Sequence, residues 1–120
     1  DRKKIEALTA DKTVEVSDCG TVFTANSSGG AIIVALPTPS AAGAGWWCKV
    51  VRINNSSNDV TINVNSAQVY GVEVSETCAE ISGTSNIVLA GSNAGLQVEM
   101  VSDGTNWLAL AHGVAAASIT

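Results

Sequence analysis

The residues of this chain that could do chemistry are few, and they do not form a recognisable catalytic set. A hydrolase needs a nucleophile, a base that activates it and a group that orients the base. The only histidine is His112, and no serine or cysteine lies in a turn of the GxSxG type that would present a nucleophile to it. We therefore expect His112 at a surface or an interface.

The carboxylates and the glycines give no stronger signal. Glu73, Glu76 and Glu80 form a local acidic cluster in polar strand-end and loop sequence. Paired carboxylates can hydrolyse glycosides, but a solvated acidic edge is the preferred interpretation of this cluster. The GAG at residues 43–45 is followed by neither Lys-Ser/Thr nor a helix, so it predicts no phosphate loop. The sequence thus predicts neither an enzyme nor a bound cofactor.

The cysteines argue against a metal site and against a disulfide framework. Cys19, Cys48 and Cys78 are odd in number, and no two of them have CxxC spacing. We expect buried free thiols, which fit assembly in a reducing host cytoplasm.

The composition is apolar and acidic. Hydrophobic residues make up 46% of the chain and charged residues only 14%, where about 25% charged is ordinary. So few charges predict either a surface that a partner covers or one coated with Ser, Thr and Asn. Residues 1–12 carry a net charge of +1 and the remainder −6, for a total of −5. This acidic body argues against nucleic-acid binding, and no apolar run reaches the about 20 residues of a membrane span.

The stretch at residues 31–53 predicts the scaffold. Two apolar runs, AIIVALP and WWCKVVRI, flank the breaker-rich TPSAAGAG, a pattern typical of two buried strands joined by a loop. Short alternating runs with turns every about 8–12 residues continue along the chain. The loop at residues 26–30 is expected to close a hairpin, and Ser102-Asp103-Gly104-Thr105 has the Asp-Gly signature of another. We predict an all-β fold, an antiparallel sandwich or small barrel of about eight to nine short strands.

The predicted β domain covers residues 9–111, with a short arm at each end. Residues 1–8 have a mild helical composition but are too short to be stable alone, so we expect them to order only against a neighbour or the body. Residues 112–120 are small and apolar, with little to fold around. The candidate partner-binding residues of the two arms are Arg2, Lys3, Lys4, Ile5 and His112.

Trp46 and Trp47 are the remaining candidate interface residues. They are adjacent in a predicted strand, so their side chains must point to opposite faces. One is expected in the core and the other on the outer face, where tryptophan favours subunit interfaces and can also stack on sugars. Burial of both, with a loop covering the outer one, is a third interpretation.

Several of these stretches together resemble a known kind of domain. They are LTADKTV at 8–14, DCGTVF at 18–23, the apolar strand ending at Leu36-Pro37, the Ala/Gly loop before Trp46, and VSDGTNW at 101–107. The combination is similar to a small all-β domain of tailed-phage structural proteins, found in capsid decoration (cement) proteins and in tail-fibre or spike modules. The chain departs from the usual pattern in having Cys19 inside the turn and in pairing two tryptophans.

The resemblance implies a virion structural protein. Fibre and spike proteins embed such a module in a much longer chain, whereas here the domain fills almost the whole sequence, so a free-standing decoration protein is expected. Such proteins commonly sit as homotrimers on the outer surface of the capsid, where they bridge major capsid proteins and stabilise the head. The alternative is a receptor- or glycan-binding module of a tail fibre or spike. Neither a nucleic acid nor a membrane is expected as a partner.

Overall fold

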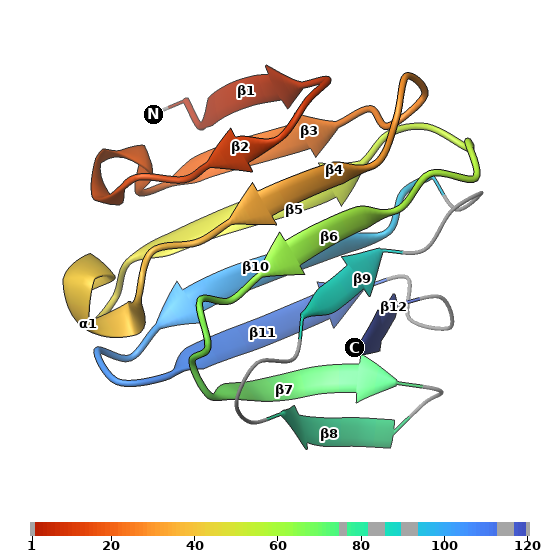
Figure 1. Cartoon of the computed structure of the whole chain (residues 1–120). Coiled ribbons are helices and arrows are strands. Elements are labelled where there is room, and N and C mark those ends of the chain that lie inside the picture. The colour runs from red at the N-terminus through yellow and green to blue at the C-terminus, as the bar shows by residue number, and fades with distance from the viewer. Residues whose placement is uncertain (1, 75–76, 82–85, 90–93, 113–116, 120) are drawn as a thin grey trace.

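Strands dominate the architecture, and they form two mixed sheets (Figure 1). The computed structural model describes residues 2–74, 77–81, 86–89, 94–112 and 117–119. Within these residues, the helical segments are η1 (Val16–Asp18), a 3-10 turn, and α1 (Pro39–Ala42). This is compatible with the predicted all-β fold. The described strands number twelve, more than expected, because some span only two or three residues.

The larger sheet has seven strands. In order across the sheet they are β1 (Lys4–Leu8), β3 (Thr21–Ala25), β5 (Trp47–Arg52), β10 (Gln97–Ser102), β11 (Trp107–His112), β7 (Val69–Val74) and β8 (Thr77–Ile81). The pairs β1–β3, β3–β5 and β11–β7 are parallel, and β5–β10, β10–β11 and β7–β8 are antiparallel. The prediction of a wholly antiparallel fold is therefore wrong.

The smaller sheet has five strands and is also mixed. In order they are β12 (Ala117–Ile119), β9 (Ile87–Leu89), β6 (Val60–Asn63), β4 (Ile32–Ala35) and β2 (Lys12–Thr13). Strands β2, β4 and β6 are parallel, whereas β9 is antiparallel to both β6 and β12. In Figure 1 this sheet lies in front of the seven-stranded one.

The first six strands alternate between the two sheets, which explains the parallel pairing. Strands β1, β3 and β5 lie in the larger sheet, and β2, β4 and β6 in the smaller one. Each strand from β3 to β6 therefore pairs in parallel with the strand two places before it in the chain. The loop at residues 26–30 connects β3 to β4 across the sheets, so the hairpin expected there is wrong. The hairpin at residues 102–105 is confirmed, because it joins the antiparallel pair β10–β11.

Both sheets contribute to one hydrophobic core. Buried and partly exposed residues alternate along β3, β5 and β10, as expected for strands with one buried face. Phe23, Val50 and Trp107 come from the larger sheet, and Ile32 and Ile62 from the smaller, and all five are completely buried in the same cluster. This shared core fixes the two sheets relative to each other.

Candidate interaction surface

The side of the seven-stranded sheet that faces away from the core is largely apolar. Successive side chains of a strand point to opposite sides, so the residues that alternate with the buried ones face outward. We call this surface the outer face. Its described side chains are Ile5, Ala7, Val22, Thr24, Trp47, Lys49, Val51, Tyr70, Gln97, Glu99, Val101, Leu108 and Leu110. Nine of these thirteen are apolar or aromatic.

The strand register arranges these side chains in rows across the sheet. One row runs Ile5, Val22, Lys49, Glu99 and Leu110. A second row runs Trp47, Val101, Leu108 and Tyr70. Strands in a sheet lie about 4.8 Å apart, so neighbours within a row are close enough to form a continuous surface.

Trp47 is anchored at the end of the second row. The Nζ atom of Lys3 lies 5.6 Å from the centroid of the Trp47 ring, within the range of a cation–π contact. Gly20 lies beside Trp47 and donates its backbone N–H to the Trp47 carbonyl oxygen at 2.7 Å. A Cβ atom at Gly20 would lie 3.9 Å from Cζ2 of Trp47, and the φ of +83° favours glycine. The backbone conformation of this turn, and not the space beside the indole ring, therefore favours glycine, because 3.9 Å is an ordinary contact distance.

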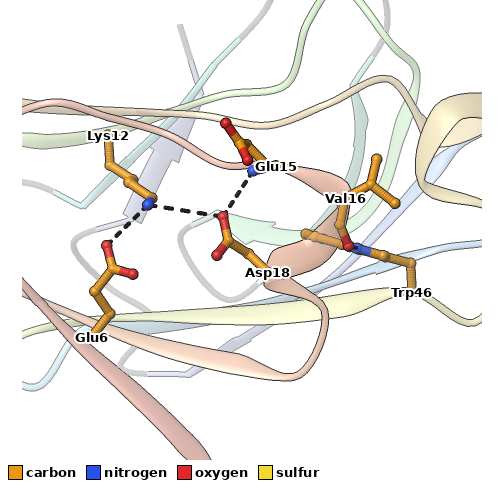
Figure 2. A network of polar contacts seen from close by, with 6 residues as sticks. All are labelled: Glu6, Lys12, Glu15, Val16, Asp18 and Trp46. Atoms are coloured by element: carbon orange, nitrogen blue, oxygen red, sulfur yellow. Dashed lines mark hydrogen bonds and ion pairs between the residues drawn. The ribbon is translucent and has the colours of Figure 1, made fainter.

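Trp46 points into the core, which confirms the prediction that the two tryptophans divide between the faces. Its side chain is only 3% exposed and meets Trp107 edge to face, with ring centroids 5.5 Å apart and an interplanar angle of 67°. Its Nε1 donates a hydrogen bond of 2.8 Å to the carbonyl oxygen of Val16 (Figure 2). Trp46 therefore adds nothing to the outer face, and Trp47 is the tryptophan that a partner can reach.

The structure brings some of the predicted arm residues to the same region. Lys4 and Ile5 begin β1, which lies against the body of the domain as an edge strand, and Arg2 is exposed just before it. Ile5 is 68% exposed and belongs to the outer face. His112 is the last residue of β11 and pairs with Gln97 through the strand register, but its side chain lies outside the described residues.

An ion-pair cluster joins the two sheets at the N-terminal edge (Figure 2). Nζ of Lys12 on β2 lies 3.1 Å from Oε2 of Glu6 on β1 and 3.9 Å from Oδ2 of Asp18. The hydrogen bond that the Lys12 ammonium donates to the Glu6 carboxylate raises the pKa of Lys12. The same oxygen of Asp18 accepts the backbone N–H of Glu15 at 2.8 Å. Charges on the inward side of edge strands discourage further strands from pairing there, so this edge is protected.

A buried arginine holds the loop at residues 54–58, and this residue was missed in the sequence. Arg52 is fully buried and donates from Nε to the carbonyl of Asn54 at 3.0 Å. Its two terminal nitrogens donate to the carbonyls of Asn58 at 2.6 Å, Ser56 at 2.5 Å and Leu89 at 3.3 Å. One signal could have found it, because Arg52 falls on the same side of β5 as the buried residues.

Serine and asparagine side chains extend this network to the neighbouring loop. Ser27 is fully buried, and its hydroxyl donates to the carbonyl of Asn58 at 2.8 Å. Nδ2 of Asn58 donates to the Ser27 carbonyl at 2.9 Å, and Oδ1 of Asn54 accepts the Ser27 N–H at 3.0 Å. The polar turns seen in the sequence are therefore hydrogen-bonded parts of the scaffold.

The described residues offer little for catalysis or metal binding. Within them, no group of three His, Cys, Asp or Glu side chains could hold a metal ion, and no helix is long and apolar enough to cross a membrane. Burial raises the pKa of the Cys48 thiol to about 12, so it stays protonated and unreactive. The expectation of buried thiols holds for Cys48 but not for Cys19, which is exposed. The side chains of the acidic cluster and of Cys78 lie outside the described residues.

An open depression lies between the segments that lead into β2 and β4. Its volume is about 420 Å³, and its lining residues are Thr9, Ala10, Asp11, Gly29, Gly30 and Ala31. Oδ1 of Asp11, the charged lining residue, accepts the backbone N–H of Ile33 at 2.8 Å. That carboxylate thus has a structural role.

Comparison with known proteins finds no family model and no curated protein that matches the chain. The inference of function therefore depends on the surface itself and on the resemblance seen in the sequence.

Proposed function

We propose that this chain is a virion structural protein of a tailed phage, which binds the exterior of the capsid as a decoration protein and bridges major capsid protein subunits. The observation that carries the proposal is the outer face, a broad and mostly apolar sheet surface on a hydrogen-bonded scaffold. Contiguous apolar surface of this kind marks sites of protein contact. We further infer that the two sheets form the layers of a sandwich and that assembly takes place in the host cytoplasm.

Stabilisation of the head follows from mass action. A protein that binds only the assembled lattice stabilises it by RT ln(1 + [L]/Kd), about 2.7 kcal/mol per site at a hundredfold excess over Kd. We propose a homotrimer, because linking three copies raises the avidity of each contact without any new interaction. The effect is repeated at every decorated site.

The basic N-terminal segment suits the contact with the capsid. Arg2, Lys3 and Lys4 are exposed at the edge of a chain whose net charge is −5. Such a segment steers the protein toward an acidic patch on the capsid, and its contribution falls as salt rises.

Binding to undecorated heads tests the proposal. The protein should co-sediment with heads that lack decoration, and it should raise the temperature at which they release DNA. Replacing Arg2, Lys3 and Lys4 together by glutamine should weaken binding, most clearly at low salt. The control replaces Thr61 and Asn63 by alanine on the smaller sheet and should bind normally. Failure of the unaltered protein to bind any head would refute the proposal.

One observation favours the alternative, a receptor- or glycan-binding module of a fibre or spike. Trp47 and Tyr70 lie at the two ends of the second row, three strand spacings or about 14 Å apart on a flat sheet. Aromatic side chains on such a face can stack on sugar rings. A glycan array with the unaltered protein and Trp47→Ala decides this point, because binding that depends on Trp47 would favour the alternative.

A further inference from the structure

We infer that copies of this chain meet through the outer face of the seven-stranded sheet. The inference names the contact surface of the homotrimer proposed above and rests on that proposal only for the number of copies. The occupant of the face is a second copy of the chain, for reasons of composition, area and charge.

The two sheet surfaces differ in composition. Among the large apolar side chains that are exposed, Ile5, Tyr70 and Leu110 lie on the outer face, at 68%, 40% and 51% exposed. The corresponding side of the five-stranded sheet carries Thr13, Ile33, Ala35, Thr61, Asn63 and Val88, of which Val88 is only 8% exposed. Of these only Ile33 is large, apolar and exposed, at 46%. The same fold thus provides an apolar face and a mixed one, and only the apolar face has the character of an interface core.

The size of the face suits a protein interface. Six of its strands carry described outward side chains, and at about 4.8 Å per strand and about 3.3 Å per residue they cover about 500 Å² of flat area. Side chains roughen that area, which brings it toward the about 800 Å² per partner of a standard protein interface. A peptide or a small ligand would cover only part of it.

The charges of the face favour a second copy over a charged partner. Lys49 and Glu99 are the charged residues of the outer face, and they are direct partners in the register of β5 and β10. Lys3, whose Nζ lies 5.6 Å from the Trp47 ring centroid, adds a positive charge at the margin of the face, so the face carries no net negative charge on a chain of net charge −5. Two acidic copies repel each other wherever their acidic surfaces meet, so an apolar face without net negative charge is where they can approach. A rotated copy can also present its Lys49 to the Glu99 of its neighbour.

Light scattering across a dilution series tests the inference. The unaltered protein should have a mass that is a multiple of the 12.2 kDa chain. Leu110→Lys replaces an exposed apolar side chain at the end of the first row by a charge beside Glu99, which can pair with it in the free subunit, and the association constant should fall at least tenfold. Ile33→Lys is the matched control, because it makes the same change at similar exposure on the other sheet, and it should leave the mass unchanged. Circular dichroism and thermal melting should show that both variants fold.

The inference is overturned by any of the following outcomes. It is wrong if the unaltered protein is a single chain at every concentration, if Leu110→Lys assembles normally, or if Ile33→Lys dissociates as readily. A single chain whose binding to heads is lost in Leu110→Lys would assign the face to the capsid. Glycan binding lost in that variant would assign it to a sugar. The mass measurement needs no capsid, so it can fail while head binding succeeds, and self-association can hold while head binding fails.

Discussion

Replacing Arg52 by methionine should destabilise the fold more than replacing Lys49, the other charged residue of β5. Methionine keeps an unbranched stem of similar length but cannot donate to the four carbonyl groups that the guanidinium holds. A hydrogen bond to a charged group contributes about 1.5–3 kcal/mol, and a buried acceptor left alone costs about 1–3 kcal/mol. Relief of the cost of burying a charge offsets part of this loss. We expect the free energy of unfolding to fall by about 3–4 kcal/mol.

Urea unfolding, followed by tryptophan fluorescence and circular dichroism, measures this change. Lys49→Met is the matched control, because Lys49 is a long cation on the same strand whose side chain faces outward and is partly exposed. In the dissociated chain its loss should cost less than about 1 kcal/mol, as is usual for surface charges. Arg52→Lys should fall between the two, since an ammonium group cannot reach the same set of carbonyls at once.

The pattern of local exchange should identify the cause. Amide hydrogen exchange in Arg52→Met should be faster at Ser27 and across the loop at residues 54–58. The backbone N–H of Ser27 donates to Oδ1 of Asn54, which belongs to that loop. The structural account of Arg52 is refuted if Arg52→Met loses less than about 1 kcal/mol, or no more than Lys49→Met. It is also refuted if the loops keep their protection.

Three further predictions concern single residues. A thiol reagent should label Cys19 in the native protein at pH 8 but reach Cys48 only on unfolding, because burial keeps the pKa of Cys48 at about 12; equal native labelling would contradict this. Asp103 should stabilise the β10–β11 hairpin above pH 3.8, and this stabilisation should be lost as the pH falls through its folded pKa, which backbone N–H groups of the turn lower. The acid limb of a stability–pH curve should therefore flatten in Asp103→Asn, and an unchanged limb would count against the assignment. Gly20→Ala should cost about 1–2 kcal/mol in urea unfolding, because a φ of +83° disfavours a side chain; a neutral result would show that the turn adapts.

The alternation of apolar and polar residues along single strands was enough to predict a β structure, but not which strands pair or in which direction. Trp46 and Trp47 were placed on opposite faces from their adjacency alone, because the side-chain period of a strand is two. This period is the same in parallel and antiparallel sheets, so it does not predict the direction of a neighbouring strand. The loop at residues 26–30 has the composition of a hairpin, yet it crosses between sheets because β3 pairs with β1 and β5 instead. Pairing is decided by contacts distant in sequence, which local patterns do not encode.

The outer face shows the same limit. The sequence identified Lys3, Ile5 and Trp47 as separate candidates. The register of β1, β3 and β5 places Ile5 and Trp47 on one surface, and the contact of Lys3 with the Trp47 ring adds Lys3 to it. Leu110 carried no local signal, because an apolar residue in an apolar strand is equally typical of a core. Arg52 did carry one, since a cation at an inward position of an alternating strand needs internal partners.

Electron cryomicroscopy of the assembled phage tests the central proposal most directly. We expect density for this domain on the outer head shell, in contact with major capsid protein and repeated around local three-fold positions. Density confined to a tail fibre or spike, or heads that never acquire the protein, would contradict it.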